Sequence, residues 1–178
     1  MDKRKIANKQ VKDRLLAALI TFSGQKDWSK VTVTELIAQA GVARASFYRN
    51  FASVEDIIEY GIHEMTEAYH QGKPFADEDF HQRAVMVYKF RFYQEHADLI
   101  LAFHRAKASQ TLLDLITDCE IAENGDMPAA SLAKYKLYYY SGAFYNMLIC
   151  WLEGGTKESP EAMADEFLRL SGGLQSPS

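Results

Sequence analysis

The segment from Thr32 to Phe51 constrains the fold of this chain more than any other feature. Thr32 is followed three residues later by Glu35, the capping-box spacing in which each side chain binds a free backbone amide at the start of a helix. Gly41 comes eight residues after Val33, where the helix must stop and glycine adopts a left-handed conformation without steric cost. The pattern predicts two short helices, over 33–40 and 44–50, joined by a tight turn at Gly41.

Elsewhere the apolar residues recur at intervals of three and four, and no long stretch alternates with period two. We therefore expect an all-α fold. Further helices are predicted over 9–23, 53–71, 79–94, 97–105, 109–123, 130–153 and 160–170. We divide the chain into a head (1–53), which is a domain of three helices, a connecting helix (54–72) and a helical body (73–178).

Charge is distributed unevenly along the 178 residues. The net charge is −4, but residues 1–50 contain ten Lys or Arg against four Asp or Glu, so this segment carries +6 and the remainder −10. Such asymmetry favours a basic face for a polyanion joined to an acidic body, although surface charge scattered by chance remains an alternative. Two short helices with basic and hydroxyl side chains on the second also suit the major groove of DNA.

The residues from Thr32 to Phe51 closely resemble the DNA-binding segment of the tetracycline-repressor (TetR) family. The resemblance rests on Ile37-Ala38-Gln39-Ala40-Gly41-Val42 followed by Phe47-Tyr48 and Phe51, and it extends over 15–62. It implies a helix-turn-helix DNA-binding domain. It also implies that the protein is a dimeric transcriptional repressor that binds a palindromic operator in double-stranded DNA. The remaining helices are then expected to hold a pocket for a small-molecule effector and the interface of the homodimer.

The resemblance assigns DNA-binding roles position by position. Arg44 and Ser46 fall where the recognition helix faces bases, and Tyr48 and Thr34 fall where family members contact phosphates. For Arg44 a phosphate contact is an alternative, and Arg49 and Asn50 could reach bases or phosphates. The basic residues Lys3, Arg4 and Lys5, together with Lys9, form either an arm that follows the DNA or a disordered start.

Three features depart from the family pattern: residues 22–28 fit the usual end of the first helix only loosely, and two single positions differ. Ala43 stands where the family often has a serine that caps the third helix, and Val54 where it often has a lysine that meets phosphate. These departures keep open an alternative function, a TetR-like protein that acts through protein partners without binding an operator.

The aromatic residues of the body are the candidates for its two functions. A small-molecule pocket is expected to draw on Ile62, Met65, Tyr69, Tyr88, Phe92, His96, Phe103 and Tyr138, for each of which a place in the core is the alternative. The helix over 130–153 carries more aromatic surface than a monomer normally hides, so we expect a dimer interface there. Its residues would be Tyr139, Gly142, Ala143, Tyr145 and Trp151, with Phe167 from the last helix. The segments 141–144, 151–155 and 159–161 also resemble a TetR subgroup that includes regulators of dihydroxyacetone utilisation.

The sequence offers little for other chemistry. It contains no nucleophile elbow, phosphate-cradling glycine loop or zinc motif, so we expect neither an enzyme nor a cofactor. His63, Glu67 and His70 have helical spacing, which leaves a metal site as a weak alternative. Cys119 and Cys150 are expected to be buried and reduced, and no stretch reaches the length of a membrane span, which together favour a cytoplasmic location.

Overall fold

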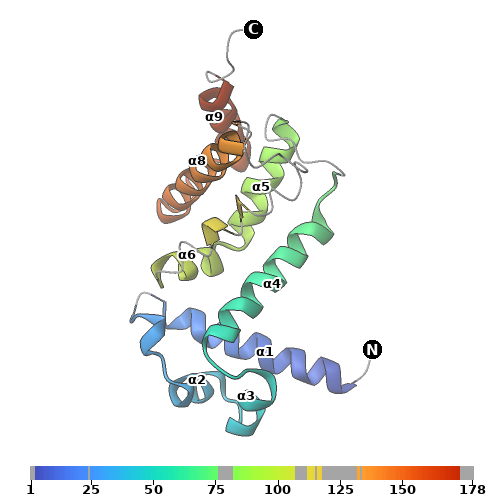
Figure 1. Ribbon diagram of the computed structural model, residues 1–178, viewed down its shortest axis with the longest axis vertical. Helices are drawn as coiled ribbons and strands as arrows, with labels where there is room; N and C mark the ends of the chain where they lie inside the picture. The colour runs from blue at the N-terminus through green and yellow to red at the C-terminus, as the bar shows by residue number, and fades with distance from the viewer. Residues whose placement is uncertain are drawn as a thin grey trace.

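A computed structural model describes residues 3–23, 25–75, 82–106, 112–114, 116–117, 132 and 134–172. The fold is all-helical, as predicted, with a helix-turn-helix unit at the amino end and a helical domain at the carboxyl end (Figure 1). The head comprises α1 (Lys3–Thr21), the short 3-10 helix η1 (Trp28–Lys30), α2 (Val33–Ala40) and α3 (Arg44–Asn50). The bounds of α2 and α3 agree with the sequence prediction: α2 begins at the capping box of Thr32 and Glu35 and ends at Gly41, and α3 follows that turn.

Helix α1 begins at Lys3, six residues before its predicted start. Residues 3–12 contain no glycine or proline and include four lysines and one arginine, both good helix formers. The basic residues Lys3, Arg4 and Lys5 therefore belong to a helix and form neither an extended arm nor a disordered start. In Figure 1 the amino-terminal turns of α1 project past α3 and α4.

Helix α4 (Glu55–Gly72) rises from the head into the body (Figure 1). The body continues with α5 (Arg83–Glu95), α6 (Ala97–Arg105), α8 (Lys134–Glu153) and α9 (Pro160–Gly172). Helix α6 has its predicted bounds, and α5 begins four residues later than predicted. Helix α8 is described from Lys134 onward, and residues 130, 131 and 133 lie outside the described residues. Within the predicted helix 109–123, residues 112–114 and 116–117 are helical, and the rest lie outside the described residues.

An aromatic contact joins the head to the body. The ring of Trp28 in η1 packs edge-on against Phe103 of α6, with centroids 5.6 Å apart, and both side chains are buried. Gly61 of α4 lies beside them, and a Cβ atom there would come within 2.9 Å of Leu16 Cδ1 and 3.4 Å of the Phe103 ring. At this point α1, α4 and α6 approach closely and join the head to the body.

The core of the body lies between α5, α8 and α9. Phe90 of α5 contacts both Phe144 and Trp151 of α8, at centroid distances of 5.1 and 5.6 Å. Phe167 of α9 is fully buried against Tyr140 and Phe144. None of the described helices is long and apolar enough to span a membrane.

Candidate nucleic-acid interface

The start of α2 is stabilised by the predicted capping box. The Thr32 hydroxyl accepts a hydrogen bond from the Glu35 amide (3.3 Å), and the Glu35 carboxylate accepts one from the Thr32 amide (2.9 Å). Lys26 adds an ion pair to Glu35 at 2.6 Å. The Lys26 ammonium, followed by the hydrogen bonds from Thr32, lowers the pKa of Glu35 to about 2. The carboxylate is thus charged at neutral pH and anchors the amino end of α2.

The turn between α2 and α3 has the conformation that the sequence predicted. Gly41 adopts φ 60° and ψ 41°, the left-handed region, and the amide of Val42 donates to the carbonyl of Ile37. Arg14 of α1 donates to the Gly41 carbonyl at 3.0 Å. The turn favours glycine because of its positive φ, and a Cβ atom on residue 41 would lie 2.8 Å from Arg14 Nη2, so the guanidinium would also have to shift.

Helix α3 turns one face inward and presents a polar face to solvent. Phe47 is fully buried and packs against Phe51, whereas Tyr48 is 53% exposed. The guanidinium of Arg44 donates to Tyr48 Oη at 3.3 Å and to Thr34 Oγ1 on α2 at 3.4 Å. These weak contacts bring the three predicted residues Thr34, Arg44 and Tyr48 together on one exposed surface that spans both helices.

The other predicted residues of α3 differ in their availability. Arg49 is exposed. Asn50 is half-buried, and its side-chain amide donates to the carbonyl of Ser46 one turn earlier, at 2.8 Å. Ser46 is itself half-buried. Arg44, Tyr48 and Arg49 are therefore the more accessible side chains of this helix.

The two single positions that depart from the family pattern have different structural consequences. Ala43 lies at the N-cap of α3, where no side-chain hydrogen bond caps the helix. Val54 packs against the hydrophobic core at the start of α4. The start of α4 is stabilised from its first turn, because Asp56 accepts hydrogen bonds from the Ala52 amide (2.7 Å) and the Ser53 hydroxyl (2.9 Å). These bonds hold the pKa of Asp56 below its usual value.

A polar groove of about 380 Å³ lies between α1, the end of α3 and α4, and we call it the α1 groove. It is lined by Lys5, Asn8, Lys9, Lys12, Arg49, Asn50, Tyr60 and Glu64. Sequence reasoning identified Lys5, Lys9, Arg49 and Asn50 but missed the other four residues. The spacing of Lys5, Lys9 and Lys12 along one face of α1 was the available signal. No signal in the sequence indicated that Tyr60 and Glu64 of α4 approach α1.

None of the predicted pocket residues lines the α1 groove or a groove between α8 and α9. Tyr69, Tyr88, Phe92 and His96 form an aromatic cluster between α4 and α5, in which the Phe92 and His96 rings stack at 4.2 Å. Ile62 and Met65 lie one to two turns earlier on α4. Phe103 is at the joint between head and body, and Tyr138 of α8 is more than half exposed. Most of the set therefore lies in the core, and Tyr138 lies outside the cluster.

The predicted interface residues divide into an outer and an inner group. Tyr139 is exposed on α8, and Gly142 and Ala143 are half-buried. Tyr145 is buried and bonded to His104 Nδ1 at 2.8 Å, and Phe167 is in the protomer core, so both are occupied within one chain. Trp151 is also mostly buried, its indole donating to the Glu158 carbonyl at 3.1 Å. Trp151 nevertheless lines an open, largely apolar groove of about 630 Å³ between α8 and α9.

The histidines and cysteines acquire no clear chemical role. Within the described part of the chain no three His, Cys, Asp or Glu side chains are grouped as metal ligands, so His63, Glu67 and His70 do not form such a site. Cys150 is exposed in the groove between α8 and α9, contrary to the expectation of burial. Cys119 lies outside the described residues.

Comparisons with known proteins agree with this geometry. Two family models match the chain: "Bacterial regulatory proteins, tetR family" over residues 15–60 and "Transcriptional regulator C-terminal region" over residues 81–173. No protein of curated function matches the sequence significantly.

Solved structures share the fold at low sequence identity. A TetR transcriptional regulator from Streptococcus agalactiae 2603V has 19% identity and a TM-score of 0.67, covering 94% of this chain and 96% of its own. Lin0861 from Listeria innocua has 13% identity and a TM-score of 0.73, covering 98% and 94%. The two matched models together span the head and most of the body. The chain therefore belongs to the TetR family of bacterial regulatory proteins.

Proposed function

We propose that this regulator is a repressor that binds a palindromic operator as a homodimer and responds to a small-molecule effector in the cytoplasm. The observation that carries the proposal is the exposed surface formed by Arg44, Tyr48 and Thr34 on a head in which α2 has a capping box and a left-handed turn at Gly41. An arginine on such a face can bond guanine O6 and N7 together, and a tyrosine or threonine hydroxyl can donate to phosphate.

In this proposal Arg44 and Ser46 read bases, while Tyr48, Thr34 and the basic start of α1 hold phosphates. The contacts of Arg44 with Thr34 and Tyr48 are long, at 3.4 and 3.3 Å, so the guanidinium can leave them for a base edge at little cost. Arg49 and Asn50 serve either class of contact. Lys3, Arg4 and Lys5 act from within a helix, because α1 includes all three.

A homodimer is proposed because one short recognition helix contacts only a few base pairs. Two heads related by a two-fold axis read two half-sites of a palindrome, spaced by about one helical turn or a multiple of it. The apolar groove between α8 and α9, with Met147, Trp151 and Leu170 in its lining, is the surface we assign to the second copy. Tyr139, Gly142 and Ala143 extend this surface along α8.

The effector is proposed to act on the aromatic cluster of Tyr69, Tyr88, Phe92 and His96. Tyr69 lies near the body end of α4, the helix that begins beside the DNA-reading face. Helix α4 can in this proposal occupy more than one position relative to the body. A ligand that binds the protein more tightly when α4 is in one of these positions shifts the population of head orientations in proportion to the difference in affinity. The resemblance of segments in α8 and α9 to dihydroxyacetone-utilisation regulators is the only pointer to a subgroup.

Selection of duplexes from a random pool tests the proposal. We expect enrichment of a palindrome, and we expect Arg44→Ala to lose more affinity for that palindrome than for random DNA. Tyr48→Phe should weaken both by a similar factor, because a phosphate contact carries no base information. If the pool yields no enriched sequence, operator binding is refuted, and the alternative of a TetR-like protein acting through protein partners is favoured.

A further inference from the structure

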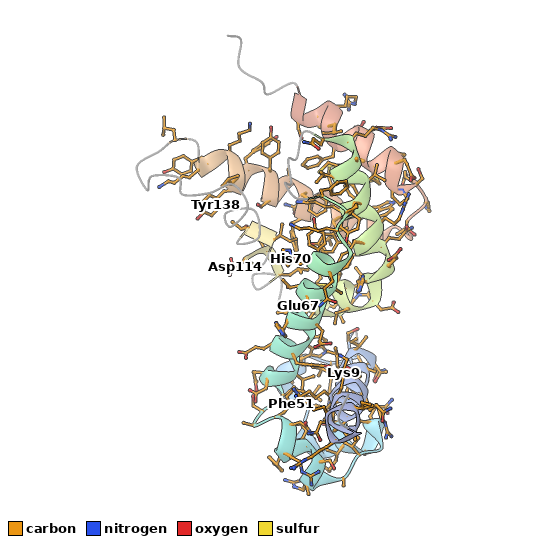
Figure 2. The ribbon with its side chains drawn as sticks, turned by 90° about the vertical axis from the view of Figure 1, so that its right-hand side faces the viewer. Lys9, Phe51, Glu67, His70, Asp114 and Tyr138 are labelled. Atoms are coloured by element: carbon orange, nitrogen blue, oxygen red, sulfur yellow. The ribbon has the colours of Figure 1, made fainter. Side chains whose placement is uncertain are left out.

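The α1 groove concentrates positive charge at the edge of the DNA-reading surface. Lys5, Asn8 and Lys12 line it from α1, and Arg49 and Asn50 line it from the end of α3. Residues three and four apart lie on one helix face, so the α1 residues form a continuous stripe along the groove. Figure 2 shows Lys9 and Phe51 in the head near the amino-terminal part of α1, which is turned toward the viewer.

Three cations of this groove form no ion pair with another described residue, so their charges are available to an external partner. Among the ion pairs of the described residues, none involves Lys5, Lys12 or Arg49. The ammonium of Lys12 lies 5.0 Å from the Tyr60 ring centroid and 5.8 Å from that of Phe51. Aromatic faces attract a cation without neutralising it, so the rings position Lys12 and leave its charge available.

Lys9 is in a different state from its neighbours. Its ammonium forms an ion pair with Glu64 of α4, and it also lies 3.2 Å from Tyr60 Oη and 3.7 Å from Asp13. The Tyr60 hydroxyl in turn donates to Asp13 at 2.6 Å. Two carboxylates thus compensate the charge of Lys9 on the wall of the groove.

We propose that the α1 groove binds a phosphate of the DNA backbone, with Lys5, Lys12 and Arg49 as its cationic ligands, and that Glu64 limits binding by holding Lys9. The inference rests on the proposed function, since the duplex is the ligand. We favour a backbone phosphate over a free phosphate as the ligand. Arg49 and Asn50 belong both to α3 and to the groove, so an anion in the groove lies next to the helix that also carries Arg44 and Tyr48.

The affinity of the enriched duplex and of a random duplex, measured against salt concentration, tests this site. Each phosphate contact contributes about 0.9 to the slope of log K against log salt. Lys12→Gln should therefore lower the slope by about 1 per bound head, with a similar loss of affinity on both duplexes. Glu64→Gln should raise the slope by up to about 1 per head, because it removes the closer of the two carboxylates that compensate Lys9 and leaves only Asp13, at 3.7 Å.

Matched variants distinguish the loss of a phosphate contact in the groove from a general effect of the protein's charge on DNA binding. Lys136→Gln removes the same charge from an exposed position on α8 in the body and should leave both slopes unchanged. Lys5→Gln is an exposed variant that tests the site independently if Lys12→Gln fails to fold, as judged by circular dichroism. Its slope should fall by about 1 per head as well.

Three results would overturn the proposal. If the Lys5, Lys12 and Glu64 variants all keep the wild-type slope while Arg44→Ala still loses selectivity, the groove is not a phosphate site and the proposed function stands. Absence of duplex binding by the wild-type protein would reject both. Saturable binding of inorganic phosphate, seen by NMR at Asn8 and Arg49 with unchanged duplex slopes in the variants, would assign the groove to a small phosphate ligand instead.

Discussion

Replacement of Gly41 by alanine tests the account of the turn between α2 and α3. A non-glycine residue in the left-handed region costs about 1–2 kcal/mol, and about 0.4–1 kcal/mol is recovered because alanine restricts the unfolded chain. The new Cβ would lie 2.8 Å from Arg14 Nη2, so the exposed guanidinium must shift, and this weakens its bond to the Gly41 carbonyl. The weakened bond adds up to about 1 kcal/mol, for a total of up to about 2 kcal/mol.

Gly155 provides a matched control. Its φ is 83°, also positive, but a Cβ there meets no atom within 4 Å. Gly155→Ala should therefore cost only the backbone difference, about 1 kcal/mol. In a chain of this size 1 kcal/mol corresponds to about 2–4 °C in Tm, so Gly41→Ala should lower Tm by up to about twice as much as Gly155→Ala.

Thermal and urea unfolding followed by circular dichroism measure both variants. In an Arg14→Ala background the cost of Gly41→Ala should fall to that of Gly155→Ala, since the contact it disrupts is already absent. Equal losses for the two glycine variants in the wild-type background would refute the role of Arg14. No loss in either would refute the argument from positive φ.

Three further predictions concern the cap of α2 and the joint between head and body. Thr32→Ala should cost about 1 kcal/mol in urea unfolding by removing the cap. Because the pKa of Glu35 is lowered to about 2 from 4.5, the charge of Glu35 stabilises the fold above pH 4.5 and this contribution is lost as the pH falls toward 2. The stability difference between wild type and Glu35→Gln should shrink over that range, and a constant difference would contradict the assignment. Phe103→Ala should cost about 3–5 kcal/mol in thermal unfolding because the ring is fully buried against Trp28, whereas the exposed Tyr138→Ala should stay within about 0.5 kcal/mol. Similar losses for Phe103→Ala and Tyr138→Ala would contradict the joint.

Much of the fold was predictable because its signals act over a few residues. The capping box at Thr32 and Glu35 and the left-handed turn at Gly41 involve backbone groups within one helical turn, and the structure contains both as expected. These local signals explain the bounds of α2, whereas no side-chain cap marks the start of α3 or of α6. The beginning of α1 was predicted too late, because a run of polar helix formers lacks the apolar periodicity used to recognise helices.

The candidate site was only partly predictable. Arg44, Tyr48 and Thr34 were found through the resemblance, and the structure brings them together across α2 and α3. Tyr60 and Glu64 were missed because they approach α1 from a helix about fifty residues later in the chain. No local pattern marks a contact of that sequence separation.

The sequence by itself determined the helices, the reader segment and the family, since these depend on local backbone chemistry and on a motif of contiguous residues. Only the tertiary structure decided which aromatic side chains are internal. Helix α8 carries large rings around much of its circumference, so its pattern does not indicate which side faces the core. Packing against α5, α6 and α9 buries Tyr145 and Phe144 and leaves Tyr138, Tyr139 and Cys150 exposed. Burial is a property of the neighbours of a residue, and those neighbours are distant in the chain.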